Sequence, residues 1–153
     1  MSKIVWILIF LVLNFSALGI GNLLMNNGPT SNWYMELNKA PWTPPGWFFG
    51  VAWTTIMICF SIYMSFLIVQ KPNSYVLSLF IIQFLLNIFW NYSFFNQHLV
   101  GLGLLVILLL TLVVGYFLIT YTSQLSQISL LIVPYFVWLI VASSLNAYVY
   151  FNN

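Results

Sequence analysis

Long apolar runs with almost no charge between them constrain this chain more than any other feature of its sequence. Only 3% of the 153 residues are charged, whereas 63% are hydrophobic. A soluble domain carries roughly a quarter of its residues as Asp, Glu, Lys or Arg. The composition therefore excludes a soluble fold, and the apolar runs are long enough to cross the hydrocarbon core of a bilayer, which is about 30 Å thick.

Five apolar segments have the length of membrane-spanning helices: residues 4–24, 47–69, 76–95, 99–121 and 130–150. They lack the two-residue alternation of membrane strands, so helices are predicted. The first run is too long for the core of a secretion signal, and we expect it to be retained. Residues 1–153 thus form one all-α integral membrane domain, a five-helix bundle. Short connections predict that sequential helices are antiparallel neighbours, and Pro134 predicts a bend early in the last helix.

The exception among the connections is the long loop over residues 26–46. Together with the start of the next span it reads WYMELNKAPWTPPGWFFGVAW from Trp33 to Trp53, which holds more than half of the chain's seven tryptophans. Proline restricts the backbone, and tryptophan favours the boundary between membrane and water. We therefore expect a structured aromatic lid over one end of the bundle.

The few charges indicate an orientation in the membrane. Five spans place Lys3, Lys71 and the polar connection 122–129 on one side, and the lid with Glu36 and Lys39 on the other. Lysines concentrate on the cytoplasmic side of membrane proteins. The sequence favours a cytoplasmic N-terminus in a bacterial cell membrane.

Polar side chains recur along single faces of two predicted helices. With a spacing of four residues, which returns to the same helix face, the third span carries Gln83, Asn87 and Asn91, and the fifth carries Trp138, Ala142 and Asn146. Trp90 lies beside the first stripe. One interpretation is that the amides only join helices by hydrogen bonds. The alternative is a pocket with aromatic walls and a few amide donors and acceptors, as is usual for apolar small molecules.

Several functional classes are excluded by residues that the chain lacks. No Asp or Glu lies within a span, so proton coupling through an embedded carboxylate has no carrier. Cys59 and His98 stand alone, which gives neither a disulfide framework nor a metal-ligand set. Hydrolysis has no Ser–His–acid or paired-carboxylate constellation, and three lysines cannot form a nucleic-acid surface. We expect no metal, no cofactor and no nucleic-acid partner.

The loop string above, the string QFLLNIFWNYSFF at residues 83–95 and the string PYFVWLIVASSLN at residues 134–146 resemble the TspO/MBR family. This is the family of tryptophan-rich sensory and translocator proteins, formerly called peripheral benzodiazepine receptors. The resemblance covers nearly the whole chain, in order and spacing. It implies a five-helix membrane bundle, often a homodimer, whose first loop covers a pocket for porphyrins such as protoporphyrin IX and other flat apolar ligands.

The resemblance also implies roles for particular residues. Tyr34 and Pro44 are expected to be lid contacts. The expected pocket walls are Trp53, Asn87, Trp90, Trp138, Ala142 and Asn146. No catalytic residue is assigned, although Trp53 and Trp138 match tryptophans implicated in the light-dependent porphyrin degradation of some bacterial members.

Three functions stay open at this point. The first is a receptor or sensor that binds porphyrin, the second is light-dependent porphyrin degradation by the pocket tryptophans, and the third is transport of a tetrapyrrole or lipid. The sequence departs from the family pattern in two places: the loop reads Lys39-Ala40-Pro41-Trp42, and no basic residue follows Tyr148. The second departure breaks the sterol-recognition pattern, which is itself a weak signal.

Overall fold

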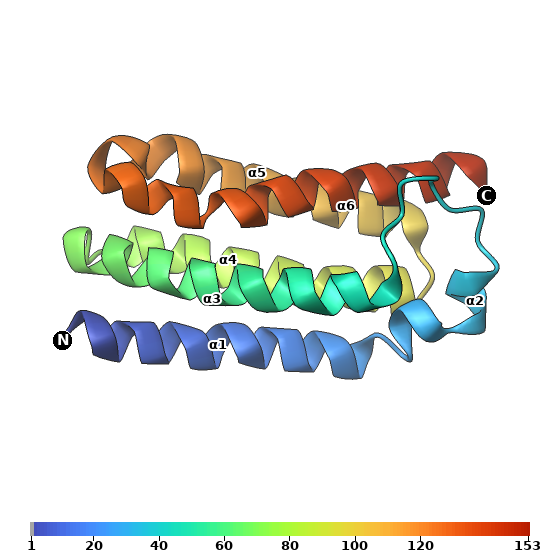
Figure 1. The fold of residues 1–153 in the computed structure, drawn as a ribbon, viewed down its shortest axis with the longest axis horizontal. Coiled ribbons are helices and arrows are strands. Elements are labelled where there is room, and N and C mark those ends of the chain that lie inside the picture. The colour runs from blue at the N-terminus through green and yellow to red at the C-terminus, as the bar shows by residue number, and fades with distance from the viewer. Residues whose placement is uncertain (1) are drawn as a thin grey trace.

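The computed structural model describes residues 2–153, and within them it contains helices and loops but no strand. Five helices are long and apolar enough to cross a membrane, which confirms the predicted all-α fold. They are α1 (Lys3–Leu24), α3 (Gly46–Gln70), α4 (Ser74–Asn91), α5 (Val100–Leu125) and α6 (Val133–Asn152). Figure 1 shows them side by side, with the N-terminus at one end of the bundle and the C-terminus at the other.

Local sequence explains where the helices begin. The Ser2 hydroxyl accepts a hydrogen bond from the Val5 amide, and the Asn73 side chain accepts one from the Val76 amide at 2.9 Å. Both side chains satisfy amides that have no partner within the helix. Pro45, in an extended conformation, directly precedes α3. Side-chain caps thus define the starts of α1 and α4, and Pro45 precedes the start of α3.

The helices pack in a ring, and one sequence-based expectation about this packing is wrong. Extensive contacts join α1 to α3 and α4, α4 to α5, and α5 to α6, whereas α3 and α4 are not an extensively packed pair. The turn that joins α3 to α4 therefore connects helices that face each other across the ring, with large side chains between them. Phe60 of α3 stacks on Phe80 of α4, with ring centroids 5.9 Å apart.

The last connection also differs from the expectation. The helix α5 continues to Leu125, a short 3₁₀ segment η3 covers Ser126–Leu131, and α6 begins at Val133 rather than at residue 130. Pro134 consequently lies in the first turn of α6. A proline there lacks only an amide that would have no partner in the helix, so it starts the helix instead of bending it.

Buried polar side chains join the helices. Asn14 of α1 donates to the Ser61 hydroxyl of α3 at 2.8 Å, and Tyr135 of α6 donates to Gln83 of α4 at 2.8 Å. Within hydrocarbon, such bonds satisfy groups that water cannot reach. The interpretation of the amides as ties between helices therefore holds for Gln83 and Asn14.

Three glycines of α5 allow α6 to approach closely. A Cβ atom at Gly101 would lie 3.1 Å from the Tyr150 ring, one at Gly103 would lie 3.2 Å from Asn146 and Phe94, and one at Gly115 would lie 3.0 Å from Phe136. These glycines therefore allow close packing of α5 against α6 and, at Gly103, against Phe94.

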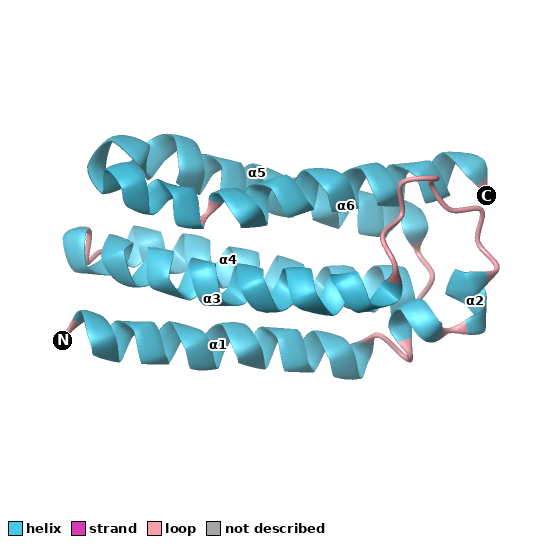
Figure 2. Ribbon diagram, in the orientation of Figure 1, coloured by secondary structure: helices cyan, strands magenta, loops and turns pink. Residues whose placement is uncertain are grey.

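The segment between α1 and α3 forms a folded cap. It contains a 3₁₀ turn, η1 (Gly28–Thr30), and a one-turn helix, α2 (Asn32–Met35), followed by an irregular stretch up to Gly46. Asn26 and Asn27 adopt left-handed backbone angles at its start, a conformation that Asn tolerates better than most residues. In Figure 2 the loop part of the cap runs across the end of the bundle near the C-terminus.

Candidate functional site

The cap is attached to the bundle by aromatic and polar contacts. Trp33 stacks on His98, with centroids 4.0 Å apart and planes within 7°. The Trp42 indole donates to the Ser144 hydroxyl of α6 at 3.0 Å. The cap is thus attached at two points, by Trp33 next to the start of α5 and by Trp42 on α6.

An asparagine pair holds the middle of the cap to the end of α6. The Asn38 amide donates to Asn153 Oδ1 at 2.8 Å, and Asn153 Nδ2 donates back to the Asn38 carbonyl at 3.0 Å. The pairing satisfies both backbone polar groups of Asn38 at a point where the cap has no regular structure.

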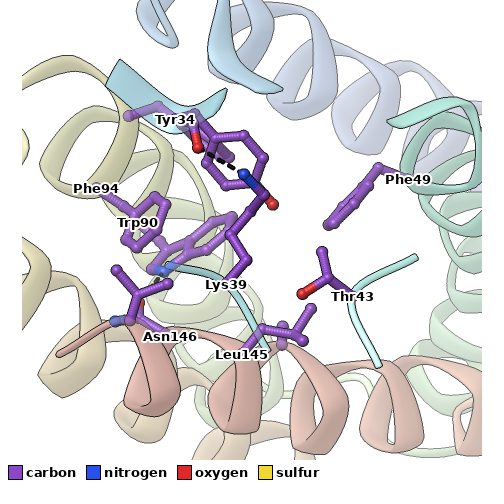
Figure 3. A pocket seen from close by; sticks show the side chains of 11 residues that line it. Tyr34, Lys39, Thr43, Phe49, Trp90, Phe94, Leu145 and Asn146 are labelled. Atoms are coloured by element: carbon purple, nitrogen blue, oxygen red, sulfur yellow. Dashed lines mark hydrogen bonds between the residues drawn. The ribbon is translucent and has the colours of Figure 1, made fainter. Parts of the chain in front are cut away.

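Lys39 is directed into the cap rather than to an acidic partner. Its ammonium group donates to the carbonyls of Tyr34, at 2.9 Å, and Met35, at 3.2 Å, and lies 4.9 Å from the centre of the Tyr34 ring. Figure 3 shows the lysine side chain extended toward Tyr34, beside Trp90. Carbonyls at a helix end attract a cation, so Lys39 closes α2 and places its own methylene chain over the bundle.

Beneath Lys39 lies a cavity, which we call the cap cavity. Its walls come from the cap, α3, α4 with the following π-helical turn η2 (Tyr92–Asn96), and α6. The lining residues are Tyr34, Lys39, Thr43, Phe49, Trp90, Phe94, Phe95, Ala142, Leu145, Asn146 and Val149. Its volume is only about 20 Å³, room for about one water molecule.

The polar groups at the base of the cap cavity are partnered within the protein. The Trp90 indole donates to Asn146 Oδ1 at 2.9 Å, and Asn146 Nδ2 donates to the Val100 carbonyl at 3.0 Å. One amide therefore joins α4, α5 and α6 at the base of the cavity. At its roof, burial raises the pKa of Tyr34, because an apolar setting disfavours the phenolate.

The predicted site residues divide among three hollows. Tyr34, Trp90, Ala142 and Asn146 line the cap cavity. Pro44 and Trp138 line an outer groove between α3 and α6, of about 410 Å³. Trp53 lines a cleft of about 310 Å³ between α1 and α3, called the α1/α3 cleft below. The structure does not bring all the predicted pocket residues to one surface.

Asn87 lines none of these three hollows. It is buried on α4, and its backbone carbonyl accepts a hydrogen bond from the Asn91 side chain at 3.1 Å. Trp138 is also buried, and its indole nitrogen has no hydrogen-bond partner among the described residues. Its ring is in contact distance of Phe48 and Phe49, with centroids 5.8 and 5.4 Å away.

Sequence reasoning missed part of the cavity lining. Leu145 and Val149 continue the α6 face that carries Ala142 and Asn146 and were recoverable from helical spacing. Phe94 and Phe95 were not, because they belong to η2, where the π-helical turn changes the direction of side chains relative to a regular helix. No sequence pattern marked Phe49 or Thr43 as lining residues, apart from their position in or next to the lid.

The arrangement suits binding by shape and stacking. No group of three His, Cys, Asp or Glu side chains that could hold a metal ion occurs among residues 2–153. The cap cavity presents aromatic faces, one amide and one ammonium group. Such a lining orients an apolar ligand through a few polar contacts.

Comparison with known proteins gives consistent matches over most of the chain. The sequence profile of the TspO/MBR family matches residues 6–151. The tryptophan-rich protein TspO of Archaeoglobus fulgidus is 32% identical, over 93% of this chain and 94% of that protein. Protein CrtK of Rhodobacter capsulatus is 36% identical over 74% of each chain. The human translocator protein is 27% identical, over 83% of this chain and 78% of its own length.

Proposed function

Because the chain belongs to the TspO/MBR family, an integral membrane family of sensor and translocator type, we propose that it binds a porphyrin, such as protoporphyrin IX, or a similarly flat apolar ligand beneath its cap. The observation that carries the proposal is the cap cavity itself, where Tyr34, Trp90 and Phe94 surround one buried amide. Aromatic faces stack on flat ring systems. The ligand acts as the signal that the protein senses.

The size of the cap cavity sets a condition on binding. Small-molecule sites commonly enclose about 300–1,000 Å³, far above the volume found beneath the cap. Tyr34, Lys39 and Thr43 line the cavity from the cap, and Phe49 lines it from the first turn of α3. A ligand must therefore displace cap or α3 side chains, and this displacement links occupancy to the position of the cap.

The lining also separates the proposed function from its alternatives. Light-dependent degradation requires Trp53 or Trp138 against the ligand, and neither lines the cap cavity in its closed form. Passive transport requires a continuous path, whereas the interior below the cavity is filled by Phe60, Tyr63 and Tyr135. Binding is the function that this lining favours.

A titration tests the proposal. Purified protein in detergent micelles, titrated with protoporphyrin IX, should show saturable quenching of tryptophan emission. Ala142→Phe places a ring in the cap cavity and should weaken the affinity at least about tenfold, because filling a site removes the ligand's contacts. Its control is Val141→Phe, since Val141 faces the outer groove.

Two results would contradict the proposal. One is wild-type protein that gives no saturable quenching. The other is an Ala142→Phe variant that retains the wild-type melting temperature and binds as the wild type does. Bleaching of illuminated porphyrin that requires Trp53 and Trp138 would instead support the degradation function.

The assembly and orientation belong to the same proposal. We expect a homodimer in a bacterial cell membrane, with Lys3 and Lys71 on the cytoplasmic side, where basic residues concentrate. In Figure 1 the cap then faces the opposite side from the N-terminus.

A further inference from the structure

One side chain borders both the cap cavity and the α1/α3 cleft. Phe49 is the one residue that lines both hollows. Figure 3 shows its ring entering the cap cavity from α3, opposite Trp90 and Lys39. Phe49 is partly buried, and its ring meets Trp138 edge-on with planes at 81°. The ring packs against the core and also borders both hollows, so it forms a partition between them.

The α1/α3 cleft opens toward the side of the bundle. It lies between the last turns of α1, at Leu18 and Asn22, and the first turns of α3, at Gly50 and Trp53, and the start of the cap closes one end of it at Met25 and Pro29. Beside it, Leu23 and Trp47 are 84% and 70% exposed, as expected of side chains that face lipid or the membrane boundary. An apolar molecule dissolved in the bilayer would thus reach the cleft between α1 and α3, below its cap end.

Two glycines leave the mouth of the cleft open. Gly46 and Gly50 are one turn apart on α3, and a Cβ atom at either position would meet nothing within 4 Å. They differ from the α5 glycines, where a Cβ atom would press on α6. The space that side chains at these two positions would occupy is part of the cleft, and no neighbouring helix fills it.

A buried hydrogen-bond donor contacts the partition, although it lines the outer groove and neither of the two hollows. Trp138, which contacts the Phe49 ring, has a buried indole N–H without a partner among residues 2–153. Buried donors normally have an acceptor. When the ring of Phe49 moves aside, Trp53 from the cleft and the Trp90 face of the cavity border one space, and its size falls in the range of small-molecule sites.

We infer that Phe49 is the gate of a lateral entrance, through which a flat apolar ligand passes from the bilayer into the cap cavity by way of the α1/α3 cleft. The inference rests on the proposed function, because it assumes that the cap cavity takes such a ligand. It adds the route, the residue that controls the route, and the reason why Trp53 belongs to the site although it lies outside the cavity.

The gate is tested by rates rather than by affinity. Protein in lipid nanodiscs is mixed rapidly with protoporphyrin IX, and the association rate is read from tryptophan quenching. Minor conformations are commonly populated at about 0.1–10%, so removing the ring in Phe49→Ala should raise the association rate about tenfold or more. Gly50→Leu fills the mouth of the cleft and should lower the rate by a similar factor.

A neighbouring residue supplies the control. Phe48→Ala removes an equally large ring that also contacts Trp138, but Phe48 lines the outer groove and neither of the two joined hollows. Its association rate should equal that of the wild type. A Cβ atom at Gly50 would meet nothing within 4 Å, so the Gly50→Leu variant should fold even if Phe49→Ala does not. Circular dichroism checks the folding of both variants.

The outcomes separate the gate from the function. Wild-type association rates in both Phe49→Ala and Gly50→Leu, with saturable binding retained, overturn the gate and leave the proposed function standing. A rate that responds to Lys39→Met but not to Gly50→Leu assigns entry to the cap and also overturns the gate. Wild-type protein without saturable quenching overturns the proposed function instead.

Discussion

Replacing Asn146 by leucine should destabilise the bundle more than any exposed polar substitution. The change keeps a similar side-chain volume but leaves the Trp90 N–H and the Val100 carbonyl without their partners, which lie 2.9 and 3.0 Å from the Asn146 amide. Hydrogen bonds between membrane helices contribute about 0.6 kcal/mol on average and up to about 1.7 kcal/mol. The two bonds together predict a loss of about 1–3 kcal/mol in the free energy of unfolding.

The assay is unfolding of the protein from dodecylmaltoside micelles by added SDS, followed by far-UV circular dichroism. Thr55→Val is the control, because the Thr55 hydroxyl is exposed and donates only to the Val51 carbonyl of its own helix. Its removal should change the unfolding free energy by less than about 0.5 kcal/mol.

A double-mutant cycle isolates the bond between Trp90 and Asn146. The single variants are Trp90→Phe and Asn146→Leu, and the coupling energy should be about 0.6–1.7 kcal/mol. A coupling energy within about 0.3 kcal/mol of zero, the usual scatter of additivity, would refute the reasoning. The amide would then serve only to line the cap cavity.

Three further predictions concern the cap and the glycines. Lys39→Met removes the hydrogen bonds from the ammonium group to the Tyr34 and Met35 carbonyls. Backbone hydrogen exchange of residues 32–38 should become about fivefold faster, which corresponds to about 1 kcal/mol for a partly exposed charged hydrogen bond. Lys39→Arg should restore part of the protection. Gly103→Leu should lower the melting temperature because a side chain there presses on Asn146 and Phe94, whereas Gly19→Leu, with open space around Gly19, should not. Burial raises the pKa of Tyr34 above its ordinary value. The stability that the neutral Tyr34 side chain gives to the cap is therefore present below pH about 10 and is lost as the pH rises through the folded-state pKa. In a titration followed by tyrosinate absorbance, the Tyr34→Phe variant should lack one component that the wild type shows above pH about 10.

The number of spans, their helical character and the existence of a structured cap were all predictable. These features follow from the near-absence of charge and from Pro and Asn clusters, because each helix must satisfy its own backbone in hydrocarbon. The order of packing was not predictable in the same way. The turn at Lys71 and Pro72 is short, yet α3 and α4 face each other across the ring, since apolar helices lack a distinct polar face that would show which neighbour each one meets.

The candidate site was predictable only in part. Helical spacing relates Ala142 to Asn146, and the structure finds both in the cap cavity. Spacing within one helix says nothing about the distance between helices, and Trp53 and Trp138 accordingly line other hollows. Phe94 and Phe95 enter the cavity through the π-helical turn, which a regular helical period does not anticipate.

The sequence by itself determined that this chain crosses a membrane as helices, because its long apolar runs carry almost no charge and lack the two-residue alternation of membrane strands. It also determined that aromatic and amide side chains gather near one end. Only the tertiary structure decided which of them meet. The position of Phe49 between two hollows depends on how α1, α3 and α6 pack around it, and packing between apolar surfaces is set by the shapes of side chains rather than by their pattern along the chain.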